Sequence, residues 1–288
     1  MDGVLSATQS PATRDSGAAV PSGPSILITG ASSGIGRALA ETLAAPDVTL
    51  HLSGRNPDRL DDVAAACRGR GATVNAATLD VRDAAAMGAW IAEGGRFDLV
   101  IANAGISAGT GERTPESLAQ VRGIFATNLD GVLNTVLPAI EIMLRQPAAA
   151  DGVRGRIAVI ASIAAFIAAP GAPAYAASKA AVDAWTVASA PTLRAHGIAL
   201  TSVCPGYIRS GMTAGNQFPM PGLMDADRAA RIILRGIAAG RMRVTFPWWM
   251  GLAARAGGLL PPRLLGWIMA NRIGKAPEPA RQQEETGT

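Results

Sequence analysis

Short apolar runs alternate with alanine-rich stretches along most of this chain, and this alternation restricts the folds open to it. The apolar runs cover residues 25–29, 48–53, 73–79, 97–102, 156–161 and 198–203. Their length and composition predict strands, and the segments between them are long enough for helices. Strands joined by crossover helices pair in parallel. The sequence therefore predicts an α/β fold with one doubly wound parallel sheet and helices on both faces.

Composition divides the chain into four parts. Residues 1–24 are rich in small and polar residues and contain no apolar run of signal-peptide length, which predicts a disordered leader. The alternating pattern fills residues 25–240, the predicted sheet domain. Residues 241–275 are apolar and predict a helical extension, while the polar residues 276–288 predict a frayed tail.

Composition also argues against two kinds of site. The formal net charge is +4, but the 26 lysines and arginines are scattered, so we expect no nucleic-acid partner. Cys67 and Cys204 form no Cys-x-x-Cys pair and there are only two histidines, so we expect neither a disulfide framework nor a metal site. Reduced thiols indicate a cytoplasmic protein.

A glycine-rich turn follows the first predicted strand and opens the apolar helix predicted at Arg37–Ala45. Residues 29–36 read Thr-Gly-Ala-Ser-Ser-Gly-Ile-Gly, a spacing variant of the dinucleotide fingerprint. Glycines let the backbone approach a pyrophosphate, whose charge meets the N–H groups and dipole of the helix. The turn predicts a cofactor corner, although a tight turn without a ligand is the alternative. Its residues are Gly30, Ser32, Ser33, Gly34, Ile35 and Gly36.

The ends of the next three strands add to this corner. A carboxylate after the second strand would bind a free ribose 2′-hydroxyl, but the chain has Arg55 there, which is able to pair with a 2′-phosphate. This favours NADP(H) over NAD(H), with a solvated Arg55 as the alternative. Asp80 and Val81 follow the third strand, where a carboxylate accepts from an adenine amino group. Asn103, Ala104 and Gly105 follow the fourth, where small residues leave room for the cofactor.

Tyr175 and Lys179 lie four residues apart, so a helix would carry them on one face. A nearby cation lowers the pKa of a phenol, which lets Tyr175 donate a proton to a carbonyl oxygen or remove one from an alcohol. Lys179 is also able to hold the nicotinamide ribose. Such a pair alone is usually only solvated. Ser162, thirteen residues upstream, adds a donor for the same oxygen.

Taken together, these motifs resemble the classical branch of the short-chain dehydrogenase/reductase family. The resemblance covers about residues 25–240 and implies a Rossmann-type catalytic domain with a Ser162–Tyr175–Lys179 set. It also implies that Asn128 holds a water for proton resupply, and that residues 211–224 form a lid. Around the nicotinamide it implies Pro205, Gly206, Ile208 and Ser210, with Ser210 standing where the family usually has threonine. A homodimer or homotetramer is implied as well.

The expected function is NADP(H)-dependent hydride transfer between nicotinamide and a carbonyl or secondary alcohol. The apolar lid and extension favour a hydrophobic substrate, such as a lipid-like, 3-oxoacyl or keto-lipid molecule. The alternative is a nucleotide-binding sensor or scaffold that keeps the fold without turnover.

The apolar extension leaves three roles open. Trp248, Trp249 and Trp267 lie among Arg255, Arg263 and Arg272, a combination that suits a bilayer interface, so residues 244–273 are a candidate for peripheral contact with the inner face of a membrane. Arginines and prolines break the stretch below the roughly 20 apolar residues of a membrane span. A flap over the substrate pocket and a contact with another subunit are the competing interpretations.

Overall fold

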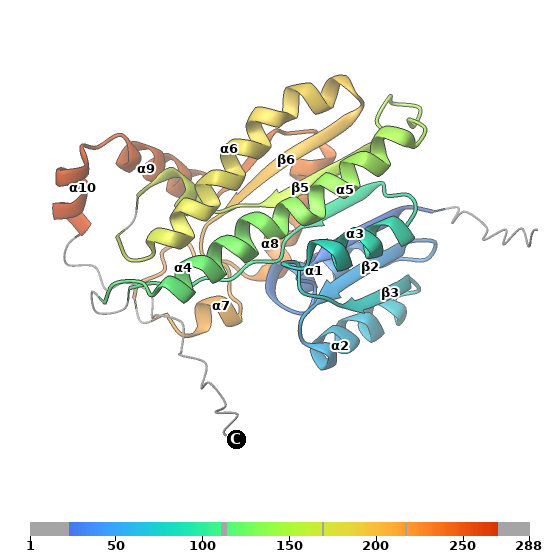
Figure 1. The fold of residues 1–288 in the computed structure, drawn as a ribbon, viewed down its shortest axis with the longest axis horizontal. Coiled ribbons are helices and arrows are strands. Elements are labelled where there is room, and N and C mark those ends of the chain that lie inside the picture. Colours follow the sequence, from blue (N-terminus) through green and yellow to red (C-terminus); the bar gives the residue numbers. More distant parts are fainter. Residues whose placement is uncertain (1–22, 111–113, 169, 217, 270–288) are drawn as a thin grey trace, which may run out of the picture.

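The computed structural model describes residues 23–110, 114–168, 170–216 and 218–269. Its sheet has seven parallel strands in the order β3-β2-β1-β4-β5-β6-β7 (Figure 1). The predicted doubly wound Rossmann-type fold is confirmed. Apart from Gly23 and Pro24, the leader predicted at 1–24 lies outside the described residues, as does the tail at 276–288. The strands are β1 (Ser25–Thr29), β2 (Thr49–Gly54), β3 (Thr73–Thr78), β4 (Leu99–Ala102), β5 (Gly155–Ile160), β6 (Ile198–Pro205) and β7 (Arg243–Phe246).

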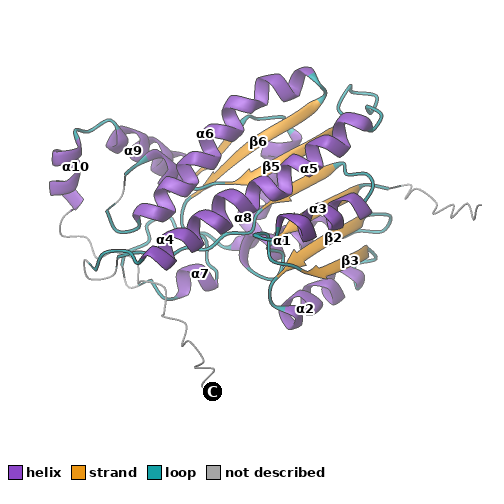
Figure 2. Cartoon of the chain, viewed as in Figure 1, coloured by secondary structure: helices purple, strands orange, loops and turns teal. Residues whose placement is uncertain are grey.

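Helices cover both faces of this sheet (Figures 1 and 2). One face packs against α1 (Gly34–Leu43), α2 (Pro57–Arg68) and α8 (Ala226–Ala238). The other packs against α3 (Ala84–Glu93), α5 (Gly131–Arg145) and α6 (Pro173–Ala195). On the latter face, α4 (Leu118–Phe125) precedes α5.

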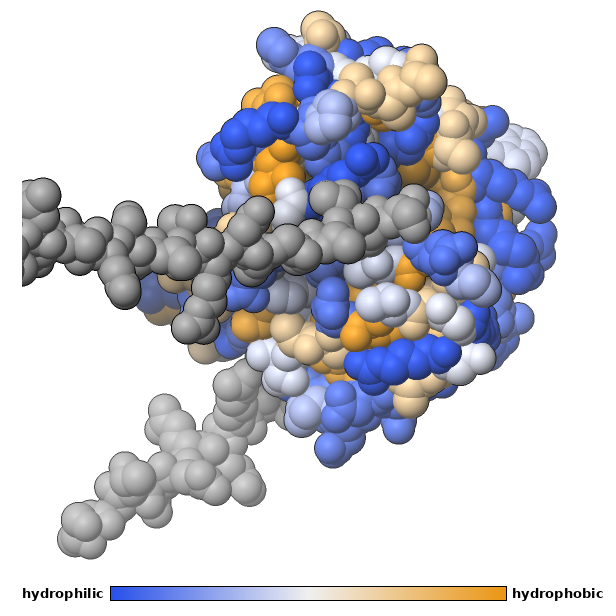
Figure 3. Space-filling model, turned by 90° about the vertical axis from the view of Figure 1, so that its right-hand side faces the viewer, coloured by the Kyte–Doolittle hydropathy of each residue, from blue (hydrophilic) through white to orange (hydrophobic). Residues whose placement is uncertain are grey.

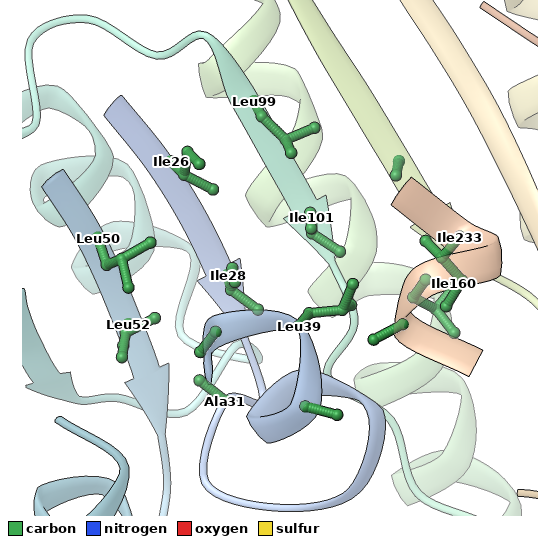
Figure 4. Close-up of a cluster of buried hydrophobic side chains, with 14 of the residues drawn as sticks. Ile26, Ile28, Ala31, Leu39, Leu50, Leu52, Leu99, Ile101, Ile160 and Ile233 are labelled. Atoms are coloured by element: carbon green, nitrogen blue, oxygen red, sulfur yellow. The ribbon is translucent and has the colours of Figure 1, made fainter. Parts of the chain in front are cut away.

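The strands are apolar because both of their faces are buried. In β4, Leu99 and Ile101 belong to the cluster beneath α1 and α8, whereas Val100 and Ala102 belong to the opposite cluster. Figure 4 shows Leu39 of α1 beside Ile28 and Ile101, which come from neighbouring strands of the sheet, in the first cluster. This two-sided packing fixes the strand register and so holds the strand ends in place.

Strand β7 was not predicted, because its four residues were assigned to the helical extension. It alternates partly exposed and buried residues and pairs in parallel with β6. Helix α9 (Trp248–Gly258) packs on β7, and α10 (Pro262–Met269) follows it. None of the helices in the described ranges combines the length and apolarity needed to cross a membrane.

The surface at the right-hand side of Figure 1 is mostly hydrophilic, with small separate apolar areas (Figure 3). Exposed large apolar side chains instead gather on α9 and α10, where Trp248, Leu252, Leu259 and Trp267 are all exposed. The order of the strands reverses between β1 and β4, and ligands of such sheets bind beyond the carboxyl ends of the strands at that point.

Candidate active site

A cavity of about 2070 Å³ opens at the carboxyl ends of the strands and extends to α9 and α10. Every residue predicted for the site lines it except Gly36 and Asn128, which lie behind its wall. The predicted residues that line it are Gly30, Ser32, Ser33, Gly34, Ile35, Arg55, Asp80, Val81, Asn103, Ala104, Gly105, Ser162, Tyr175, Lys179, Pro205, Gly206, Ile208 and Ser210.

The glycine-rich loop lies against this cavity with its backbone tightly folded. Gly30 and Gly34 have φ angles of +65° and +55°, a region that favours glycine. A Cβ on Gly36 would overlap the Gly30 carbonyl. The Asn103 amide donates to the carbonyls of Thr29 and Gly30, at 3.0 and 3.1 Å. Asn103 therefore holds the shape of the loop, a role that the sequence analysis did not assign to it.

The end of β2 fits the sugar of a dinucleotide. Ser53 Oγ is the one buried side-chain polar atom without a hydrogen-bond partner in the described ranges, and Ser53 lines the cavity. Arg55 and Arg59 also line it, and neither forms an ion pair with a described carboxylate. An unpaired hydroxyl and two cations suit a ribose and its phosphate. The sequence analysis did not assign Ser53 or Arg59 to the site. Ser53 was included in a predicted strand and given no further role.

Asp80 is held by Arg82 at the end of β3. The guanidinium donates to Oδ1 and Oδ2 of the carboxylate, and the Arg82 backbone N–H adds a further hydrogen bond of 3.0 Å to Oδ1. These hydrogen bonds, chiefly that of the side chain, hold the pKa of Asp80 below its ordinary value. The carboxylate is thus charged and oriented beside the cavity, where it is able to accept a hydrogen bond from an amino group.

Ser162 and Tyr175 meet near the centre of the cavity. Ser162 follows β5 and begins the 3₁₀ helix η2 (Ile163–Phe166), whose Ala164 N–H donates to its hydroxyl at 3.1 Å. Tyr175 lies in the first turn of α6 and shares a hydrogen bond with Ser162. Lys179, one turn further on, lies 6.0 Å from the centre of the Tyr175 ring and donates to the Ile160 carbonyl at 2.7 Å.

Burial dominates the titration of Tyr175 and Lys179. It raises the pKa of Tyr175, against the lowering effect of the hydrogen bond from Ser162. It lowers the pKa of Lys179 to about 8. The lowering of the Tyr175 pKa by Lys179, which the sequence analysis expected, is not found in this arrangement. The ammonium lies beside the ring and directs its hydrogen bond to the backbone.

Asn128 lies behind the cavity wall in the π-helical segment η1 (Ala126–Asp130), which joins α4 to α5. π-Helical turns inside longer helices are frequent at functional sites. Its oxygen accepts from the Ile106 N–H at 2.8 Å, and its amide donates to the Ile106 carbonyl and the Ser178 hydroxyl, each at 3.0 Å. A Cβ on Gly105 would lie 3.2 Å from Asn128 Oδ1 and 3.4 Å from Lys179 Nζ, so a side chain at this position would crowd both groups.

The strand-end cleft and the Ser162–Tyr175–Lys179 group define a nicotinamide-dependent oxidoreductase. A family model described as short chain dehydrogenase matches residues 24–218, and the chain belongs to this family. An uncharacterized oxidoreductase of Myxococcus xanthus is 36% identical over 240 residues, 82% of this chain and 92% of the relative. The ketoacyl reductase HetN of Nostoc sp. is 33% identical over 207 residues, 70% of this chain and 69% of the relative.

Solved structures of the family share the fold. A short-chain dehydrogenase/reductase from Burkholderia phymatum in complex with NAD matches with a TM-score of 0.72 and 25% identity, covering 81% of this chain and 92% of that one. A short-chain dehydrogenase from Sphingobium yanoikuyae in complex with NADPH matches with a TM-score of 0.71 and 28% identity, covering 82% and 94%. The chain is accordingly an NAD(P)-dependent dehydrogenase or reductase.

We expect the ammonium of Lys179 to titrate near pH 8, far below the ordinary lysine value of 10.5, because burial penalises its charge. The sequence contains only two lysines, Lys179 and Lys275, so NMR of protein labelled with ¹³C-lysine should give two resolvable side-chain titrations. In the variant Lys275→Arg, the one lysine signal that remains belongs to Lys179. A midpoint for Lys179 at its ordinary value would contradict the desolvated geometry.

Proposed function

We propose that this protein reduces a carbonyl group of a hydrophobic substrate with NADP(H) as the cofactor. The observation that carries the proposal is the meeting of Ser162, Tyr175 and Lys179 in a cavity that also contains the glycine-rich loop. When bound, the nicotinamide supplies the hydride. Tyr175 donates the proton to the carbonyl oxygen, which Ser162 also hydrogen-bonds, and the product is an alcohol.

In this proposal the role of Lys179 and Asn128 is proton resupply and not substrate binding. A buried lysine whose pKa is lowered to about 8 exchanges protons near neutral pH more readily than an exposed one. Gly105 has no side chain to crowd Lys179 Nζ and Asn128 Oδ1, which supports a water between them as the link for proton resupply.

The preference for NADP(H) rests on the end of β2. No carboxylate stands directly after this strand, whereas Arg55, Arg59 and the unpaired Ser53 hydroxyl line the cavity there. An arginine pairs well with a ribose 2′-phosphate, and it gains nothing comparable from a free hydroxyl. The NADPH complex of the Sphingobium yanoikuyae relative supports the same choice, although the Burkholderia phymatum relative carries NAD.

A hydrophobic substrate is supported by the outer part of the cavity, toward α9 and α10. Apolar residues of several elements line it: Ile163, Met212, Phe218, Trp249, Leu260, Leu265 and Ile268. Met212 and Phe218 belong to the segment 211–224, which we propose as the lid. The cavity exceeds the roughly 300–1,000 Å³ of a typical ligand site, so it has room for cofactor and a long substrate together. A 3-oxoacyl compound or keto-lipid fits these features, and the ketoacyl reductase relative supports this class.

The alternative from the sequence, a sensor or scaffold without turnover, is disfavoured by the residues of the cavity. A binding protein has no need for a serine, a tyrosine and a buried lysine grouped in one cavity. The presence of all three groups favours the enzyme. The two thiols, Cys67 and Cys204, are free and buried, which suits a cytoplasmic enzyme.

Replacing Tyr175 with Phe should lower turnover of a hydrophobic ketone by about 10²–10⁴-fold, because the proton donor is removed while the ring remains. NADPH oxidation against ketones of increasing chain length measures this, and NADPH fluorescence should show nearly unchanged cofactor binding. Turnover at the level of the unmodified enzyme would refute the role of Tyr175.

Replacing Arg55 with Ala should raise the KM for NADPH by about tenfold or more and change the KM for NADH by less than about twofold, because only the 2′-phosphate loses its partner. The variant Arg122→Ala removes an exposed arginine far from β2 and serves as the matched control. Equal effects on both cofactors would remove the assignment of Arg55 to the phosphate.

We also propose that the protein forms a homodimer or homotetramer through the outward face of α5. Leu133, Leu137, Ile140 and Leu144 recur at helical spacing there, and Leu137 and Leu144 are 47% and 43% exposed. Light scattering should find an oligomer, and Leu137→Glu should shift it toward monomer while Met242→Glu, an exposed site elsewhere, should not. A monomeric unmodified protein would exclude this interface.

A further inference from the structure

Helix α9 carries an apolar stripe that no described residue covers. Trp248, Leu252 and Leu259, the last being the residue that directly follows the helix, are 75%, 61% and 87% exposed. At about 100° per residue, these three side chains fall within about 40° of one another around the helix axis. In α10, Trp267 is 76% exposed as well. Isolated exposed apolar residues are ordinary, but a stripe of this kind marks an interaction surface.

The orientation of this stripe is fixed by two close contacts on a neighbouring side of α9, about 60–80° around the axis from Trp248. A Cβ on Gly251 would overlap the Thr245 side chain of β7, and a Cβ on Gly258 would overlap the Phe166 carbonyl of η2. The helix therefore packs directly on these two elements. The stripe cannot turn inward without separating those contacts.

A second cavity, of about 560 Å³, lies beside this stripe, and we call it the arginine pocket. It is formed by α8, β7 and α9, and its lining contains four arginines and no acidic residue: Ile232, Arg235, Gly236, Arg241, Arg243, Val244, Thr245 and Arg255. Four guanidinium groups around one concavity create a positive potential that attracts anions, phosphate above all.

Only one of the four arginines has a carboxylate partner in the described part of the chain. Arg243 donates to both oxygens of Asp183, at 2.9 and 2.7 Å. Arg235 and Arg241 are exposed and form no ion pair with a described carboxylate. Arg255 stacks over the Phe166 ring, with its guanidinium carbon 4.2 Å from the ring centre. Three positive charges thus remain available to an outside anion.

Helix α9 joins the stripe, the arginine pocket and the substrate cavity. Arg255 lies about 20° from Trp248 around the axis, so the arginine pocket borders one edge of the stripe. The other side of the helix carries three residues that line the substrate cavity, Trp249, Met250 and Ala253. A substrate flap explains these three residues, but it does not explain Trp248, Leu252 and Leu259.

We propose that α9, α10 and the arginine pocket dock on an anionic phospholipid bilayer. The arginine pocket binds headgroup phosphates while Trp248, Leu252, Leu259 and Trp267 enter the interfacial layer. A second copy of the chain is a poor occupant, because a two-fold contact would set the arginine pocket against itself. Delivery of a lipid-like substrate past α9 rests on the proposed function, whereas docking itself does not.

Vesicle co-sedimentation of the full chain tests docking without any use of activity. We expect binding to vesicles that contain phosphatidylglycerol, and at least about tenfold weaker binding to pure phosphatidylcholine vesicles. Two double variants, Arg235→Glu/Arg241→Glu and Trp248→Ala/Leu252→Ala, should each lose most of the binding. The controls Arg122→Glu and Leu118→Ala change an exposed arginine and an exposed leucine on α4 and should bind normally.

Three results would overturn the proposal. They are recovery of the unmodified protein in the soluble fraction with anionic vesicles, equal loss of binding in the controls, and binding that does not need the arginines. Calorimetry with inorganic phosphate separates the sources of the anion, since phosphate binding without vesicle binding points to a free anion and refutes docking. Circular dichroism verifies that each variant is folded. Turnover of a short, soluble ketone should be unchanged in both double variants, and inactivity of every form would refute the proposed function alone.

Discussion

The hydrogen bonds from the Asn103 side chain to the carbonyls of Thr29 and Gly30 are the constraint on which the cofactor corner depends. They tie the end of β4 to the loop after β1, across the point where the strand order reverses. The Thr29 hydroxyl completes the tie by accepting from the N–H groups of Asn103 and Ala104. With the loop held in this shape, α1 begins with its N–H groups directed at the cavity, and the remaining strands carry their polar ends to the same edge.

The fold was largely predictable because its strands are buried on both faces and read as continuous apolar runs. Strand β7 escaped prediction for the opposite reason. It lies at the edge of the sheet, alternates partly exposed and buried residues, and merges in sequence with an apolar helix. Composition alone does not separate a short edge strand from the helix that follows it.

Motif reasoning selected residues around the site better than it described their contacts. The sequence indicated that Tyr175 and Lys179 share a helix face, but it gave no sign that Lys179 donates to the Ile160 carbonyl or that burial governs both pKa values. It overlooked Ser178, within the same motif, as the partner of Asn128. Such details depend on which backbone groups the tertiary fold brings near, and spacing does not encode them.

Two glycines of α9 limit how the shape of the cavity can change in this chain. Gly251 and Gly258 bring the helix into direct contact with the Thr245 side chain of β7 and the Phe166 carbonyl of η2, which fixes the position of the outer wall of the cavity. The width of the cavity is then set by side-chain volume at Trp249, Met250 and Ala253. Larger side chains at these three positions would narrow the cavity, and smaller ones would widen it, without any change in the packing of α9.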